Sequence, residues 1–266
     1  MTTTSGGSRG SSGSGEGGAG PLLVARAGAP TVAPEHTIPA YEAAIRAGAD
    51  ALLVDVHLSA DDQLAVIRDE RLERTTDGRG RVRDRTLAEL KRLDAGRWFG
   101  RAFRGQRIQT LSEVLERFRE RAAFAVSISR GSDVYPGIEE RLVGLLQVYE
   151  VIERSLVLSL DHHALLRCHE LDPEVRTGAV VVARLLAPEK LAPPGVLRAV
   201  CLEAELTTGR EVAACRAAGL DCHVLRVDDP ETARRFAAMG VAGIVTDRPD
   251  LLRAALDAPA PGSRGR

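Results

Sequence analysis

The sequence predicts an α/β protein, a (β/α)8 TIM-type barrel with a small insertion after the second strand. Short runs rich in β-branched residues alternate with amphipathic helical patterns from residue 21 onward, an order that is typical of parallel sheets. Eight of these runs can serve as parallel strands, the number that closes such a barrel. The chain has 266 residues, 44% of them hydrophobic, which suits one barrel with a sizeable core.

The eight strand-like runs are five to eight residues long and rich in Val, Leu and Ile. Apolar runs of this length are typical of strands that are buried on both faces of a parallel sheet. They span residues 22–26, 51–58, 124–129, 155–160, 176–182, 197–203, 222–227 and 243–247.

Helical patterns lie between these runs. In the first, over residues 37–48, Ile38, Tyr41 and Ile45 fall on one face, and Gly48 marks the end of the helix. The spacing predicts further helices over residues 110–121, 137–150, 162–171, 208–218 and 230–239.

One further run, AVIRD at residues 65–69, does not fit the alternation. Only the segment SADDQ separates it from the second predicted strand, and a parallel crossover needs a dozen or more residues. We therefore expect residues 65–69 to form a hairpin partner or part of an insertion that covers about residues 59–109. An open, doubly wound sheet is the alternative fold, but no glycine-rich phosphate loop follows the first strand.

Both ends of the chain differ in composition from the predicted barrel segment, residues 21–258. Thirteen of the first 20 residues are Gly or Ser, so we expect a disordered tail over residues 1–20 and a short flexible tail over residues 259–266. The N-terminal segment lacks the apolar stretch of a signal peptide, and no apolar run reaches the ~20 residues that cross a bilayer. We expect a cytoplasmic protein with no membrane span.

The charge and the cysteines exclude some classes of partner. A formal net charge of −1 provides no general attraction to nucleic acid or to acidic lipid. The four cysteines show no metal-site spacing, and we expect them to be small buried thiols in a reducing compartment.

Several long stretches carry a family resemblance over nearly the whole barrel segment. They read APEHTIPAYEAAIRAGAD, VDVHLSADDQLAVIRDERLERTTDG, LAELKRLDAGRWFG, IQTLSEVL, LSLDHHALL and GVAGIVTDRPDLL. In them the sequence resembles the glycerophosphodiester phosphodiesterase (GDPD) family. The resemblance implies a TIM-type barrel with an insertion after the second strand. It also implies metal-dependent hydrolysis of glycerophosphodiesters to glycerol 3-phosphate and an alcohol, a reaction of lipid metabolism.

The resemblance further implies two catalytic histidines and a phosphate-contacting arginine, but the matching positions differ here. Where the family's first strand ends in AHRG, this chain has ARAG, so Arg26 replaces the first histidine and Ala27 the arginine. The family's second histidine belongs to an HD pair, which here is Arg68-Asp69. An arginine side chain, with a pKa of about 12.5 or higher, stays protonated and cannot shuttle protons. We therefore assign no catalytic residue and expect an impaired or inactive member, a pseudoenzyme.

The metal site implied by the resemblance is also incomplete. Glu35 in APEHT and Asp55 on the second predicted strand match two carboxylate ligands, whereas Leu53 and Ser127 stand where the family has carboxylates. Two carboxylates can hold a weakly bound, mostly hydrated Mg²⁺, but Ca²⁺ prefers six to eight oxygens. We keep Glu35 and Asp55 as residual metal ligands, with Mg²⁺ or Ca²⁺ as the cofactor if activity remains.

The two arginines suggest a different use of the site. We expect Arg26 and Arg68 to pair with Glu35 and Asp55, because an unpaired carboxylate in a barrel mouth is unfavourable. A site rebuilt for an anion would instead use the guanidinium groups to hold a phosphate or carboxylate.

Two histidines complete the predicted ligand-binding set of Arg26, Arg68, His36 and His57. His36 stands where the family has an asparagine, and His57 lies beyond Asp55 on the same strand face. Either histidine is also a candidate for a replacement acid or base.

Three functions remain open from the sequence. The leading hypothesis is a pseudoenzyme that binds a small anionic or phosphate-bearing molecule. The second is an active or altered phosphodiesterase that uses Glu35 and Asp55 with a metal. The third is a scaffold or partner-binding protein without a ligand in the barrel. Metal-dependent turnover distinguishes the second hypothesis, and ligand-induced thermal stabilisation distinguishes the first from the third.

Overall fold

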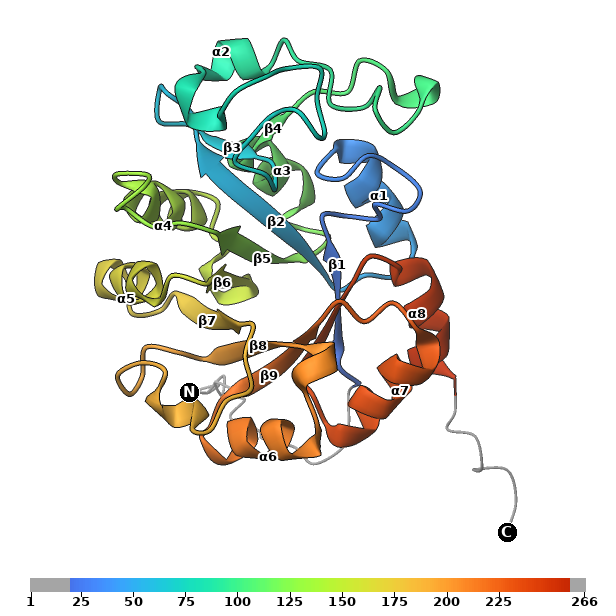
Figure 1. The fold of residues 1–266 in the computed structure, drawn as a ribbon, viewed down its shortest axis with the longest axis vertical. Helices are drawn as coiled ribbons and strands as arrows, with labels where there is room; N and C mark the ends of the chain where they lie inside the picture. The colour runs from blue at the N-terminus through green and yellow to red at the C-terminus, as the bar shows by residue number, and fades with distance from the viewer. Residues whose placement is uncertain (1–19, 259–266) are drawn as a thin grey trace, which may run out of the picture.

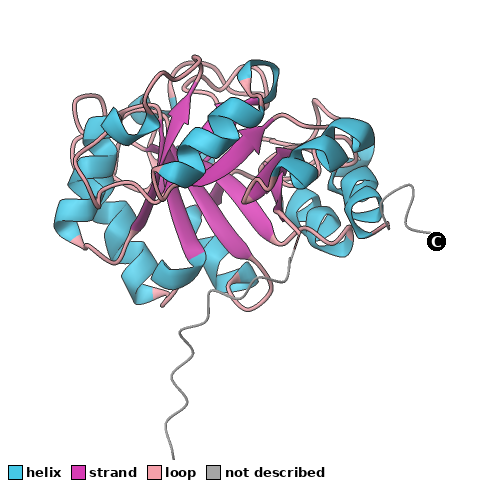
Figure 2. Cartoon of the chain, turned by 90° about the horizontal axis from the view of Figure 1, so that it is seen from below, coloured by secondary structure: helices cyan, strands magenta, loops and turns pink. Residues whose placement is uncertain are grey.

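The computed structural model describes residues 20–258, and within them eight parallel strands close into a barrel (Figures 1 and 2). Around the barrel the strands follow chain order, and the last pairs with the first. They are β1 (Leu22–Arg26), β2 (Ala51–Leu58), β5 (Ala123–Ile128), β6 (Ser155–Ser159), β7 (Arg176–Val181), β8 (Ala199–Glu203), β9 (Asp221–Leu225) and β10 (Gly243–Thr246). The predicted fold class is confirmed.

Seven helices of the described residues cover the outside of the barrel (Figure 2). They are α1 (Ile38–Arg46), α3 (Leu111–Phe118), α4 (Ile138–Val148), α5 (His162–Leu171), α6 (Gly209–Ala217), α7 (Pro230–Met239) and α8 (Pro249–Asp257). The sequence patterns did not identify α8, which starts with a proline, a residue favoured in the first turn of a helix. Between β7 and β8 the chain forms only a short 3-10 turn, Pro188–Lys190.

The predicted insertion lies between β2 and α3, beyond the far end of β2 (Figure 1). Its first strand, β3 (Leu64–Val66), pairs antiparallel with β2, so the hairpin is confirmed. Strand β4 (Gln109–Thr110) then pairs with β3. Between these strands lie α2 (Leu87–Leu90) and the 3-10 turns Val82–Asp84 and Arg101–Phe103. A small apolar cluster of its own packs the insertion: Ala65, Ile67, Leu72, Val82, Leu90, Ala95 and Ile108.

Side chains inside the barrel alternate along each strand with side chains that pack under the helices. An apolar layer crosses the middle of the interior and consists of Val24, Leu53, Leu158, Cys201 and Val245, with Ala51 and Ala125. At the carboxyl ends of the strands, charged residues line the interior. At the amino ends, apolar residues line the interior and charged residues lie at its entrance.

The sequence also predicted two tails, buried cysteines and no membrane span. Most of both predicted tails, residues 1–19 and 259–266, lies outside the described residues. The four cysteines are free and buried, as expected. Among residues 20–258, no helix combines the length and the apolar character that crossing a membrane requires.

Candidate site at the barrel mouth

The carboxyl ends of the parallel strands meet at one end of the barrel, where TIM-type barrels place their sites. A cavity of about 170 Å³ opens there. Three arginines and two carboxylates line it, together with Ser127 and apolar side chains of the middle layer. The charged residues are Arg26, Arg68, Arg226, Asp55 and Glu203.

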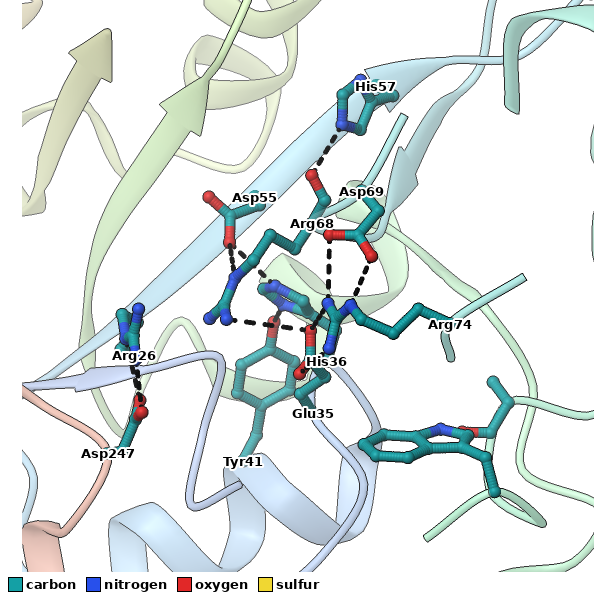
Figure 3. A network of polar contacts seen from close by, with 12 residues as sticks. Arg26, Glu35, His36, Tyr41, Asp55, His57, Arg68, Asp69, Arg74 and Asp247 are labelled. Atoms are coloured by element: carbon teal, nitrogen blue, oxygen red, sulfur yellow. Dashed lines mark hydrogen bonds and ion pairs between the residues drawn. The ribbon is translucent and has the colours of Figure 1, made fainter. Parts of the chain in front are cut away.

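Arg26, at the end of β1, forms a bidentate ion pair with Asp247 (Figure 3). Its Nε lies 2.8 Å from Oδ1, and its Nη2 contacts Oδ2. The expected pairing of Arg26 with Glu35 or Asp55 is therefore wrong. The register explains this, because Ala25 pairs with Thr246, so the next residues of β1 and β10 lie side by side. In the register with β2, Arg26 lies opposite Leu53, two residues short of Asp55.

Arg68 behaves as expected and lies between the two surviving carboxylates (Figure 3). Its Nε is 3.4 Å from Asp55 Oδ2, and its Nη1 is 4.0 Å from Glu35 Oε1. The third nitrogen, Nη2, is buried and has no hydrogen-bond partner among the described residues. A buried donor without a partner is unfavourable, so we expect a water molecule or a ligand in the cavity to accept a hydrogen bond from this nitrogen.

Arg74, in the insertion, is the site residue that sequence reasoning missed. It donates two hydrogen bonds to Glu35, of 2.9 and 2.7 Å, and its Nη2 lies 3.1 Å from Asp69 Oδ1. The fold of the insertion brings Arg74 to Glu35, which lies in the loop before α1 and is 39 residues away in the chain. The local sequence RDERLER, residues 68–74, contains no pattern that predicts this contact.

The two predicted histidines contact the charged residues of the site: in Figure 3, His36 lies beside Asp55, and His57 lies above Arg68. His36 lies 2.8 Å from the Tyr41 hydroxyl through Nδ1 and 2.9 Å from Asp55 Oδ2 through Nε2. His57 lies 2.9 Å from the Tyr135 hydroxyl and 2.9 Å from the backbone oxygen of Arg68. Both rings are buried, and neither residue lines the mouth cavity. Each imidazole thus holds a neighbouring residue in place, and ligand binding by His36 or His57 stays a prediction.

The backbone of the mouth is locally strained. Ala27, His36 and Arg226 have φ angles of +58°, +59° and +59°, in the left-handed region that side chains other than glycine rarely adopt. Residues held in this way are often found at binding and catalytic sites, where the surrounding structure fixes them. The backbone at the mouth therefore has the conformation that is often found at binding sites.

Burial opposes ionisation of both surviving carboxylates, but their partners outweigh it. For Asp55, the hydrogen bond with His36 and the nearby charge of Arg68 lower the pKa to about 2. For Glu35, the hydrogen bonds from Arg74 and the charge of Arg68 lower the pKa below its ordinary value. Both groups are therefore ionised at neutral pH.

These residues do not fit a divalent metal. Among residues 20–258, no three His, Cys, Asp or Glu side chains lie close enough together to hold one. The Glu35 carboxylate is occupied on both oxygens by Arg74, and Asp55 by His36 and Arg68. Side-chain cations thus occupy the places from which a cation would bind these carboxylates, and we derive no chemical step through a metal.

The residues that line the mouth cavity are suited to holding a polar molecule. None of the described residues that line the cavity carries an imidazole, thiol or amine, and Arg26 has a raised pKa because its pairing with Asp247 outweighs burial. Arg226 lies beside Glu203, with contacts of 2.9 and 2.5 Å to one carboxylate oxygen. Fixed cations and carboxylates can hold and orient a polar molecule, but they supply no group that transfers protons near neutral pH.

Comparison with known proteins agrees with the resemblance. The model of the glycerophosphoryl diester phosphodiesterase family matches residues 27–251. A glycerophosphodiester phosphodiesterase of Caldanaerobacter subterraneus is 36% identical over 239 residues, which cover 87% of this chain and 96% of that protein. One from Bacillus subtilis is 33% identical over 86% of this chain and 84% of its own length.

Solved structures show the same relationship. A phosphodiesterase from Oleispira antarctica, in complex with the product sn-glycerol-3-phosphate, matches with a TM-score of 0.84 at 26% identity, over 90% of this chain and 98% of that one. A glycerophosphodiester phosphodiesterase from Agrobacterium tumefaciens matches with a TM-score of 0.79 at 29% identity, over 88% and 99%. With its barrel, its insertion and its family match in agreement, the chain belongs to the glycerophosphodiester phosphodiesterase family.

Proposed function

We propose that this member of the family has lost metal-dependent hydrolysis and binds a small phosphate-bearing anion at the barrel mouth. The observation that carries the proposal is Arg68, whose Nη2 is buried beside the cavity with no partner among the described residues. A phosphate oxygen is a strong acceptor for a guanidinium N–H group. Each lining arginine is already paired with a carboxylate, Arg26 with Asp247, Arg68 with Asp55 and Arg226 with Glu203. The unpartnered Nη2 of Arg68, and not an excess of positive charge, therefore supports the proposal.

The loss of hydrolysis rests on the missing acid and base. Arg26 and Arg68 occupy the positions of the family's two histidines, and both carry permanent charge. Arg74 and Arg68 also neutralise Glu35 and Asp55, the pair that would otherwise attract a metal. The cytoplasmic location remains a further prediction.

Turnover is the first test. We expect no release of glycerol 3-phosphate from a panel of glycerophosphodiesters, with Mg²⁺, Ca²⁺ or EDTA, beside the Bacillus subtilis relative as a positive control. Turnover that EDTA removes and Asp55→Ala abolishes would instead establish the altered phosphodiesterase.

Binding is the second test, by isothermal titration calorimetry with glycerol 3-phosphate. One charged hydrogen bond is worth about 1.5–3 kcal/mol, so Arg68→Met should weaken binding by about 10- to 150-fold. Arg68→Lys keeps the charge but loses the planar donor group, so it should also bind less tightly. Arg167→Met is the matched control, because Arg167 pairs with Glu140 on the outer helices. No binding by the unaltered protein, or equal binding by Arg68→Met, would refute the proposal and favour the scaffold hypothesis.

A further inference from the structure

A second cavity lies at the opposite end of the barrel, where the strands begin. Its volume is about 190 Å³, slightly larger than that of the mouth. The first residues of six barrel strands contribute to its lining: Leu22, Ala51, Ala123, Ser155, Arg176 and Asp221. Leu158 of the middle layer lines both cavities, so this layer separates the two spaces.

Small side chains create this lower cavity. The interior of a TIM-type barrel is ordinarily filled by layers of bulky branched residues. Here β2 and β5 contribute Ala51, Ala123 and Ala125 to the lining, and Gly243 of β10 lies directly beside the inward-pointing His223. A Cβ atom on Gly243 would lie 2.2 Å from His223 Nδ1, so the glycine leaves room for the ring.

Two polar side chains lie in the interior of the cavity: His223, and Ser155, whose buried hydroxyl has no hydrogen-bond partner among the described residues. The neighbours of His223, Cys222 and Val224, point outward into the core under the helices, so His223 points inward, beside Cys201 and Gly243. The residue is only 6% exposed and lines the cavity, and neither ring nitrogen has a hydrogen-bond partner among the described residues. Burial lowers the pKa of His223 to about 4, so the ring is neutral near pH 7 and can both donate and accept one hydrogen bond.

The charges at the cavity entrance balance. Arg154 and Arg176 face Glu153 and Asp221 across the rim, and Arg176 lies 3.3 Å from Asp221. A charged ligand would find no excess of opposite charge there and would lose hydration in the apolar interior.

We propose that this lower cavity is a binding site for a neutral small molecule with one apolar ring and one hydroxyl or N–H group, anchored on His223. An apolar cavity of about 150 Å³ is known to stay dry and to accept a single benzene ring, so the size suits one ring with a small substituent. The site is independent of the mouth and of the phosphate-binding proposal.

The test compares phenol with benzene on the full chain by isothermal titration calorimetry. We expect phenol to bind with a Kd of about 1 mM or tighter, and benzene to bind about 2- to 12-fold more weakly because it lacks the hydrogen bond. His223→Leu should remove this preference. Ala123→Leu fills the cavity and should abolish binding of both probes, whereas Ala213→Leu, an exposed change on α6, should leave binding unaltered.

A second readout keeps the test independent of variant folding. In the unaltered protein, phenol should shift the NMR signals of the His223 ring, identified by their loss in His223→Leu, and should leave those of His162 and His163 in place. Phenol binding should also survive Arg68→Met. Absence of binding up to about 10 mM, binding that Ala123→Leu does not change, or His223 signals that do not move would each overturn the proposal.

Discussion

Replacing Arg74 by methionine tests whether side-chain cations hold the mouth together. Arg74 donates hydrogen bonds of 2.9 and 2.7 Å to Glu35, whose side chain is 8% exposed. After the substitution only Arg68 remains near Glu35, at 4.0 Å. The variant therefore leaves a buried carboxylate without a close partner.

The magnitude follows from the two exposures. Removing one partner of a fully buried pair costs about 3–5 kcal/mol, while exposed pairs contribute about 0–1 kcal/mol. The Arg74 side chain is 45% exposed, so we expect a loss of about 1.5–3 kcal/mol, between these limits. For a domain of this size that is a fall in Tm of about 3–12 °C.

The effect should depend on pH in a defined direction. The folded-state pKa of Glu35 is lowered, so its contribution to stability is present above the unfolded pKa and is lost as the pH falls through the folded value. The difference between Arg74→Met and the unaltered protein should thus be largest near pH 7 and should shrink as the medium becomes acidic.

The assay is urea unfolding followed by circular dichroism at several pH values, with Glu35→Gln and the double variant to complete a cycle. Arg81→Met is the matched control, since Arg81 lies in the same insertion and pairs at 3.5 Å with the exposed Glu70. It should give no measurable change. A loss below about 0.5 kcal/mol for Arg74→Met, or one that does not vary with pH, would refute the reasoning.

Three further changes probe the mouth and its supports. Gly28 has φ +90°, and a Cβ there would lie 2.6 Å from the Ala40 carbonyl carbon. Gly28→Ala should therefore lower the free energy of unfolding in urea by more than about 2 kcal/mol. Gly105 has the same φ but open space around it, so Gly105→Ala is the control and should lower it less. Phe118 is fully buried and stacks edge-on against Tyr41 at 5.8 Å, so Phe118→Ala should cost about 3–5 kcal/mol, and a loss under 1 kcal/mol would contradict this packing. Asp247→Asn should free Arg26 and tighten glycerol 3-phosphate binding in calorimetry, whereas weaker binding would show that the Arg26–Asp247 pair orients the site.

The sequence predicted the barrel well because its signals are local. Apolar runs such as residues 51–58 and the hairpin signal at residues 65–69 depend on a few neighbouring residues, and both elements are observed. Helix α8 was not predicted because its apolar pattern, within RPDLLRAAL, is short and begins almost directly after β10. Positions at strand ends, including Arg26 and Asp55, could likewise be placed at the mouth.

Pairing at the mouth was harder to predict because it depends on contacts between distant segments. Arg26 meets Asp247 across 221 residues, through the closure of the barrel, and Arg74 meets Glu35 through the fold of the insertion. Neither contact leaves a pattern in the local sequence. The rule that the last strand lies beside the first could have identified Asp247, since that residue ends the last predicted strand, residues 243–247.

Two arginines balance the charges of the two carboxylates at the mouth. Glu35 and Asp55 remain buried and ionised, which requires nearby positive charge. In this chain Arg68 and Arg74 supply that charge, and both belong to the insertion that follows β2. These ion pairs connect the insertion to the barrel through Glu35 and Asp55, so the stability of the site depends on the packing of the insertion against the barrel.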